Sequence, residues 1–305
     1  MTAPDPILIL GSGAMACLFA GRLSAAGVPV TMLGSWRAGL EALSQHGVTL
    51  IEENGSQLTR RVAVLHQSDP CAEFRYALVL VKSWQTRQAA EQLKKCLRYN
   101  GVALTLQNGL GNREMLSEVL GAQRVALGVT TLAANLLAPG QVQAAGEGII
   151  SLGVHSRVAP LVKALASAGF KVESVSDPDS LLWGKLVINA AINPLTALLG
   201  VPNGELLSRP TARALMVSLA KETAAVAETQ GIPLPYPDPV EAVETVAKKT
   251  AANHSSMLRD ISRHAPSEID AICGAIVRAG EQAAVLTPLN QLMWQLVKAL
   301  APNSA

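Results

Sequence analysis

The chain has 305 residues, of which 49% are hydrophobic and 16% are charged, so it can form two domains with separate cores. Its formal net charge is +2, and it has no dense basic run with interleaved aromatic residues. These properties exclude nucleic acid as an expected partner. The four cysteines stand singly and the five histidines lack ligand spacing, so we expect neither a disulfide framework nor a bound metal.

An apolar stretch covers residues 7–26. It has no basic segment before it, contains Gly11 and Gly13, and is interrupted by Arg22. These features argue against both a signal peptide and a membrane helix. We therefore expect a soluble, cytoplasmic protein without a membrane partner.

Strand-like and helix-like patterns alternate in the first part of the chain. Short apolar runs predict strands at 7–10, 28–33, 77–81, 102–106 and 125–131. Helical patterns separate several of them, at 14–26, 37–46 and 86–97. This alternation is typical of βαβ units and predicts a parallel sheet.

The pattern then changes. Alternating residues with several glycines at 141–152 predict strands added at the sheet edge, followed by a helix at 159–168 and a last strand at 171–175. From residue 180 onward the pattern is helical, with proline and glycine interruptions. We therefore predict an α/β domain over 1–175 and an all-helical domain over 176–305.

The first strand leads into Gly11-Ser12-Gly13-Ala14-Met15-Ala16, a GxGxxA motif that opens directly into a helix. The first glycine permits a tight turn, the second lets the backbone approach a pyrophosphate, and the small last residue lets the helix pack on the strand. The helix N-terminus adds N–H groups and a positive dipole. We expect residues 11–15 to bind a dinucleotide; the alternative is a glycine turn without a ligand.

The end of the second strand bears on the choice of dinucleotide. It reads Leu33-Gly34-Ser35-Trp36-Arg37, without the carboxylate that accepts from the ribose hydroxyl in NAD enzymes. Ser35 can donate to a phosphate, and Arg37 can pair with one bidentately. These residues favour NADP. The alternative for Arg37 is a solvated residue at a helix start.

Two further strands end in polar residues. Lys82 follows the buried run 77–81, and Asn108 comes just after the run 102–106. Ligands bind at the carboxyl edge of open α/β sheets, so both residues are candidates for contacts with cofactor and substrate. For Asn108, which precedes Gly109, an ordinary Asn-Gly turn is the alternative.

An apolar helix predicted over 181–199 carries three polar exceptions. Lys185, Asn189 and Asn193 are spaced i, i+4 and i+8, so they share one stripe. Unpaired polar groups are costly in a buried helix, so the stripe predicts the wall of a cleft; the alternative is a solvated or internally paired stripe. Pro194 should bend or end the helix just after Asn193.

Two later segments, 253–260 and 266–274, also combine polar and apolar residues. In the second, Pro266 and Glu268 fit the start and first turn of a helix. That pattern is a purely structural alternative to a role for Glu268 in a site.

These segments together resemble the ketopantoate reductases (2-dehydropantoate 2-reductases), from end to end of the chain. The matching segments are GxGAMA at 11–16, VKSWQT at 81–86, QNGLG at 107–111, WGKLVINAAINPLTAL at 183–198, PNGEL at 202–206, NHSSMLRDI at 253–261 and SEIDAICG at 267–274. Several long motifs in the same order are far more specific than any single motif.

The resemblance implies an N-terminal Rossmann NADP-binding domain and a helical C-terminal domain like that of 6-phosphogluconate dehydrogenase, with the active site in the cleft between them. It implies NADPH-dependent reduction of ketopantoate to D-pantoate, a step in pantothenate and coenzyme A synthesis. It makes Lys185 the general acid and Glu268 a catalytic residue that assists at the reacting oxygen. The substrate-binding residues it implies are Asn189, Asn193, Asn253 and Ser256, with Lys82 and Asn108 near nicotinamide and substrate.

One departure from the family concerns the segment after the second strand. Family members often carry a single arginine there, whereas this chain has both Ser35 and Arg37. Two alternatives remain open for the activity: reduction of another branched 2-keto acid, or a non-catalytic dinucleotide sensor. A small 2-keto acid is the expected partner, and a homodimer is the assembly we consider.

Overall fold

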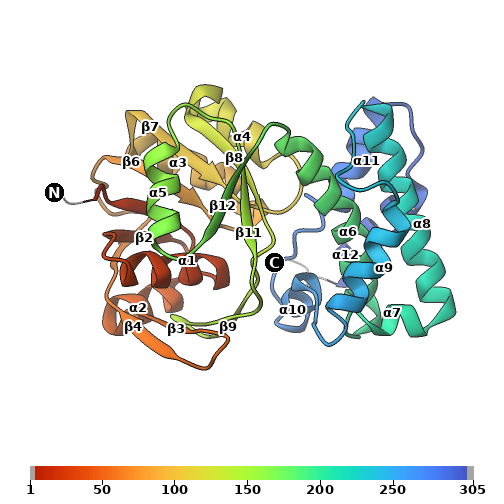
Figure 1. Cartoon of the computed structure of the whole chain (residues 1–305), viewed down its shortest axis with the longest axis horizontal. Helices are drawn as coiled ribbons and strands as arrows, with labels where there is room; N and C mark the ends of the chain where they lie inside the picture. The colour runs from red at the N-terminus through yellow and green to blue at the C-terminus, as the bar shows by residue number, and fades with distance from the viewer. Residues whose placement is uncertain (1–3, 301–305) are drawn as a thin grey trace. The chain divides into compact units, whose positions relative to one another are not determined.

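The structure is a computed structural model that describes residues 4–300. Its contacts divide the chain into two units (Figure 1). Unit 1 comprises the residues up to Gln107 together with Asn112–Pro178, and unit 2 comprises Asn108–Gly111 together with the residues from Asp179 onward. The short segment Asn108–Gly111 therefore leaves unit 1 and packs with the helices of unit 2.

A large sheet forms the centre of unit 1. Its strands, in spatial order, are β12 (Lys171–Val175), β11 (Ile149–Gly153), β8 (Val125–Thr130), β7 (Leu97–Thr105), β6 (Phe74–Val79), β1 (Ile7–Leu10), β2 (Val30–Gly34) and β5 (Ala63–His66). All neighbouring pairs are parallel except β11 with β8. The predicted α/β fold with a parallel sheet is confirmed.

The alternation of side chains along β1 explains why both faces of this sheet are covered. Ile7 and Ile9 belong to one hydrophobic cluster and Leu8 and Leu10 to another, and all four are buried. Successive strand residues point to opposite faces, so a continuous apolar run is what a central strand requires. The helices around the sheet are α1 (Ala14–Ala25), α2 (Arg37–His46), α3 (Thr86–Cys96), α4 (Asn112–Leu120) and α5 (Ala159–Ser167), with short turns η1 (Ser83–Gln85) and η2 (Ala122–Arg124).

A second sheet in unit 1 was not predicted from the sequence. It has the order β4 (Gln57–Arg60), β3 (Val48–Ile51), β10 (Gln141–Ala144) and β9 (Ala134–Ala138). The prediction that 141–152 forms strands added at the sheet edge holds in part: β11 joins the main sheet next to its edge strand β12, whereas β10 pairs with β3 in the small sheet. Helix α1 contacts both sheets and is buried over most of its surface, as a uniformly apolar helix must be.

Unit 2 is built from helices. They are α6 (Pro178–Leu199), α7 (Glu205–Ser208), α8 (Pro210–Thr229), α9 (Pro239–Lys249), α10 (Ser256–Ser262), α11 (Cys273–Gln282) and α12 (Pro288–Leu300). Helix α6 supplies much of the apolar core, including Trp183, Leu186 and Ile192. Of the two outcomes expected at Pro194, a bend or an end of the helix, the end is contradicted, since the helix continues for five residues beyond it, to Leu199. Tertiary packing of the apolar residues around Pro194 outweighs the lost backbone hydrogen bond.

Helix α6 is also long and apolar enough to cross a membrane, judged by length and composition alone. In the structure 72% of its most apolar window is buried inside the protein. Burial of this kind is what the central helix of a folded helical core shows, and it removes the apolar surface that lipid would otherwise cover.

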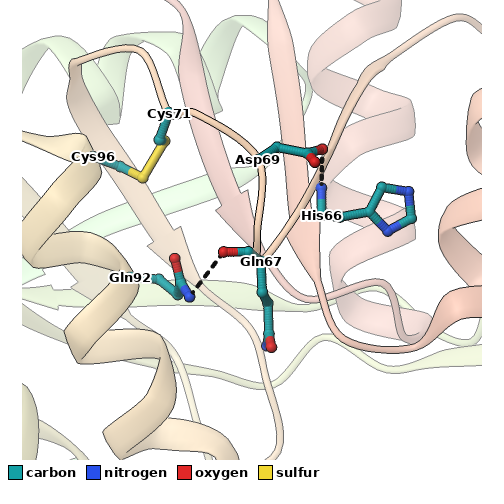
Figure 2. Close-up of a disulfide and its surroundings, with 6 residues drawn as sticks. All are labelled: His66, Gln67, Asp69, Cys71, Gln92 and Cys96. Carbon is teal, nitrogen blue, oxygen red and sulfur yellow. Dashed lines mark hydrogen bonds between the residues drawn. A yellow bond between two sulfur atoms is a disulfide. The ribbon is translucent and has the colours of Figure 1, made fainter.

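The expectation that no disulfide is present was wrong. Cys71, in the loop before β6, is bonded to Cys96 at the end of α3, with 5.4 Å between their Cα atoms (Figure 2). The two cysteines are 25 residues apart, and their proximity follows from the packing of α3 beside β6 rather than from any local spacing. Cys17 and Cys273 are buried thiols. Between residues 4 and 300, no cluster of three or more metal-ligating side chains occurs.

Candidate active site

The glycine turn after β1 has the backbone geometry that its sequence predicts. Gly11 has φ +126°, and a Cβ atom there would lie 2.9 Å from the carbonyl oxygen of Leu80. Its N–H donates to the carbonyl of Leu33 at 2.8 Å, which ties the turn to the end of β2. Only glycine can adopt this conformation in this space without strain.

The second glycine of the motif marks open space instead. Gly13 is the N-cap of α1, and a Cβ atom built on it would meet no atom of the protein within 4 Å. Beside it Ser12 is buried, while Ala14 and Met15 form the first helical turn and are half-buried. The start of α1 therefore has free space beside Gly13, and the backbone N–H groups of a helix N-terminus suit a phosphate.

The two residues expected near an NADP phosphate lie at the end of β2 and the start of α2. The Ser35 hydroxyl accepts a hydrogen bond of 2.9 Å from the side-chain amide of Gln85. Arg37 is largely exposed and forms an ion pair with Glu41 one turn farther along α2, with 2.6 Å between Nε and Oε1. Arg37 thus has a carboxylate partner in the structure, which a phosphate would have to share or displace.

Lys82 lies where β6 gives way to the turn η1. The carbonyl oxygen of its neighbour Val81 accepts a hydrogen bond of 3.0 Å from the side chain of Gln107. The same amide donates to the hydroxyl of Thr86, which donates in turn to Asn112. This buried network fixes the backbone around Lys82 at the carboxyl edge of the sheet, where the sequence places it.

Unit 2 brings together three of the predicted residues. The side-chain amide of Asn108 donates to Glu268 Oε2 at 3.3 Å. Glu268 is 6% exposed and interacts electrostatically with Lys185. Burial lowers the pKa of Lys185 to about 8, although the negative charge of Glu268 raises it. An ammonium with such a pKa can give up its proton near neutral pH.

Close backbone packing holds Asn108 beside Glu268. Gly109 has φ +81°, and a Cβ atom there would lie 2.3 Å from the carbonyl oxygen of Ala271. The N–H of Leu110 donates to that same oxygen at 2.9 Å. The Asn-Gly pair lies in a bend rather than in an ordinary hydrogen-bonded turn, and this bend packs on Ala271 and brings Asn108 to Glu268.

Glu268 does not lie in the first turn of a helix. Helix α11 begins only at Cys273, and the segment before it is a series of turns in which the N–H groups of Ala271 and Ile272 both donate to the carbonyl of Glu268. The helical interpretation of Pro266 and Glu268 was therefore wrong. Glu268 therefore belongs to an irregular segment, against which Asn108 and Gly109 of the same chain pack.

The remaining polar residues of α6 continue from Lys185, with Asn189 half-buried and Asn193 buried. Farther along the same helix, Thr196 donates to the hydroxyl of Ser255 at 2.7 Å. Ser255 is the N-cap of α10 and accepts from the N–H of Leu258 at 3.1 Å.

This capping contact attaches the start of α10 to α6. It thereby fixes the position of two predicted substrate residues, Asn253 and Ser256, which are exposed on either side of the cap. Sequence reasoning missed the structural roles of Thr196 and Ser255. The pattern of a serine before an apolar helical segment could have indicated the cap.

A parallel sheet with a glycine turn, together with a lysine that interacts with a buried glutamate in a helical unit, is typical of dinucleotide-dependent oxidoreductases. Two family models match the chain: "Ketopantoate reductase PanE/ApbA" over residues 7–157 and "Ketopantoate reductase PanE/ApbA C terminal" over residues 178–301. The chain belongs to the ketopantoate reductase family.

Individual relatives agree with this assignment. The 2-dehydropantoate 2-reductase of Pyrobaculum aerophilum is 34% identical over 95% of this chain and 96% of its own length. A PanE/ApbA family ketopantoate reductase from Ralstonia eutropha, of known crystal structure, has a TM-score of 0.90 at 31% identity and covers 97% of this chain and 98% of that one. D-mandelate dehydrogenase in a ternary structure with NADH and anilino(oxo)acetate has a TM-score of 0.91 at 25% identity, with coverage of 97% and 98%.

Proposed function

We propose that the protein reduces 2-dehydropantoate (ketopantoate) to D-pantoate with NADPH, in the cytoplasm, as a step towards pantothenate and coenzyme A. The observation that carries the proposal is the grouping of three residues in unit 2: Lys185, whose pKa burial lowers to about 8, the buried Glu268 that interacts with it electrostatically, and Asn108, which donates to Glu268. Family membership and relatives named 2-dehydropantoate 2-reductase support the substrate.

The residues of the glycine turn fit a dinucleotide. The open space over Gly13 and the N–H groups at the start of α1 would take the pyrophosphate, and the close approach at Gly11 gives the turn its shape. Lys82 and Asn108 are the proposed contacts near the nicotinamide and the substrate. A bound reduced nicotinamide nucleotide supplies the hydride.

The chain's own residues supply the proton and the binding groups. As negative charge develops on the C2 oxygen of the keto acid, the Lys185 ammonium stabilises it and then transfers a proton to it. Glu268 keeps the lysine protonated and orients it, and Asn108 holds Glu268 through the 3.3 Å hydrogen bond. Asn253 and Ser256 are the proposed anchors of the substrate carboxylate, with Asn189 and Asn193 binding the rest of the substrate.

The choice of NADPH rests on the end of β2. No carboxylate occurs between Leu33 and Arg37, so the group that would bind the NAD ribose and repel a phosphate is missing there. Ser35 and Arg37 are the proposed phosphate contacts, with Arg37 exchanging Glu41 for the phosphate.

The test is an assay of NADPH oxidation, monitored as the loss of the nicotinamide absorbance, with ketopantoate or ketoisovalerate as the substrate. Ketopantoate should give the higher kcat/KM, and NADPH should exceed NADH. Binding of NADPH without turnover of any keto acid would favour a dinucleotide sensor and contradict the proposal. A higher kcat/KM with ketoisovalerate than with ketopantoate would indicate that the substrate is another branched 2-keto acid.

A second candidate arises from D-mandelate dehydrogenase, whose NADH complex has nearly the same fold. It is NADH-dependent interconversion of a bulkier 2-keto acid and its 2-hydroxy acid. Assays with NADH and a phenyl-substituted 2-keto acid distinguish it, because a kcat/KM above that for ketopantoate and NADPH would replace the first proposal.

A further inference from the structure

A small pocket lies beside the end of β2. Its polar lining consists of Ser35, Gln67, Gln85, Gln88 and Gln92. Within the described chain, the residues that line this pocket carry no charge. In a Rossmann domain the end of the second strand lies at the adenosine ribose, so this pocket is at the adenosine end of the proposed nucleotide site.

Gln67 is the residue of this lining that comes from a loop. Its side-chain oxygen accepts a hydrogen bond of 2.9 Å from Gln88, and its backbone carbonyl accepts one of 3.3 Å from Gln92, both on α3. The carbonyl oxygen of the Gln67 side chain is used in this contact, so the part of the amide that can serve a ligand is its N–H donor group. Such donors suit the acceptors of an adenosine ring, ribose or phosphate.

The loop that carries Gln67 is attached to α3 a second time, by the disulfide. The loop begins with a turn in which the His66 N–H donates to the Asp69 carboxylate at 2.8 Å. Two residues later Cys71 is bonded to Cys96, which is fully buried at the end of α3 (Figure 2). The disulfide and the two glutamine contacts thus hold the same loop against one helix, on either side of the exposed Ser68 and Asp69.

We propose that Gln67 contacts the adenosine end of the bound dinucleotide and that the Cys71–Cys96 disulfide is a positioning element for Gln67. The inference rests on the proposed nucleotide site. With the bond cleaved, the contacts of Gln67 with Gln88 and Gln92 lose this covalent support, so Gln67 samples other positions and the nucleotide binds more weakly. The disulfide belongs to unit 1 and the proposed proton donor Lys185 to unit 2, so kcat at saturating NADPH should be unchanged.

Cleavage uses a dithiol reductant such as dithiothreitol. The dithiol gives up two electrons and two protons and becomes a cyclic disulfide, while Cys71 and Cys96 each become a thiol. Calorimetric titration of the full chain with NADPH, in the absence of a keto acid, then measures affinity before and after reduction. Reduction, Cys71→Ser and Gln67→Ala should each raise the Kd by about 3- to 10-fold.

The decisive comparison is the double variant Gln67→Ala/Cys71→Ser. If the disulfide acts through Gln67, the double variant binds NADPH no more weakly than Gln67→Ala alone. Titration with AMP should show the same losses, whereas nicotinamide mononucleotide, which lacks the adenosine, should bind all variants equally. Gln57→Ala, at an exposed position in β4, is the matched control and should bind like the unaltered protein.

Additive losses in the double variant, or equal losses for AMP and nicotinamide mononucleotide, would overturn the proposal, because both indicate a general loosening of unit 1. An unchanged Kd after complete reduction would overturn it as well. If Cys71→Ser fails to fold, reduction of the unaltered protein and of Gln67→Ala gives the same comparison. If the protein binds NADPH normally but reduces no keto acid, the proposed reaction is contradicted, while the role of Gln67 and the disulfide can still be tested by these binding measurements.

Discussion

The glycine turn of unit 1 and the polar cluster of unit 2, formed by Asn108, Lys185 and Glu268, differ in what they offer a ligand. In the glycine turn, the lack of a side chain lets Gly11 pack closely against Leu80 and leaves open space at Gly13. In the polar cluster, the half-buried Lys185 and the buried Glu268 are the charged groups to which we assign the chemistry. Substitutions in unit 1 therefore test space and nucleotide affinity, and substitutions in unit 2 test charge and turnover.

The largest effect is expected for Lys185→Ala. Loss of the proton donor should lower kcat by about 10²–10⁴-fold, while the KM for NADPH changes little. Steady-state kinetics check this, with Lys249→Ala on the exposed end of α9 as the matched control. A near-normal kcat would remove Lys185 from the reaction.

The pH dependence of kcat should follow the same lysine. The pKa of Lys185 is lowered to about 8 by burial, and reduction requires the protonated form. The rate should be constant below that pH and fall about tenfold per unit above it. Glu268→Gln removes a charge that raises this pKa, so the falling limb should move to lower pH. A limb that stays in place would contradict the electrostatic link.

Gly13→Ala tests the space over α1. A methyl group there meets no protein atom within 4 Å, so the melting temperature should not fall. It would occupy the position of the pyrophosphate, and the KM for NADPH should rise about 10-fold, or about 1.4 kcal/mol. Differential scanning calorimetry and initial rates separate the two quantities. A lower melting temperature with an unchanged KM for NADPH would show that Gly13 is needed for folding and not for binding of the pyrophosphate.

Ser256→Ala should raise the KM for the keto acid by about 10-fold and leave kcat nearly unchanged, because a hydrogen bond to a carboxylate contributes about 1.5 kcal/mol. The matched control is Ser262→Ala, at the other end of α10. Equal KM values for Ser256→Ala and the unaltered protein would remove this serine from the substrate site.

The smallest effect is expected at the end of β2. Arg37 is exposed and already paired with Glu41, so Arg37→Ala should raise the KM for NADPH by only about 3-fold and leave that for NADH unchanged. Glu41→Ala, which frees the arginine, should lower the KM for NADPH. Equal changes for the two nucleotides would contradict a phosphate contact.

Local sequence patterns predicted the βαβ order, the glycine turn and the apolar helix with Lys185, because each depends on residues close in sequence. The small sheet escaped prediction because β3 and β10 are short and pair across a long stretch of chain. The disulfide and the position of Glu268 escaped prediction for the same reason. Cys71 meets Cys96, and Glu268 meets Asn108, through tertiary packing and not through a local sequence pattern. Pro194 shows the converse, a strong local signal overridden by a buried environment.

The pairing of β3 with β10 has a consequence for biosynthesis. Thr49 lies opposite Gln141, so after β3 leaves the ribosome the nascent chain must be extended by about ninety residues before its partner leaves the ribosome too. Until then the outer face of α1, which β10 helps to cover, remains open to water and to chaperones. Residues near 144 therefore mark the earliest point at which co-translational closure of this layer can occur.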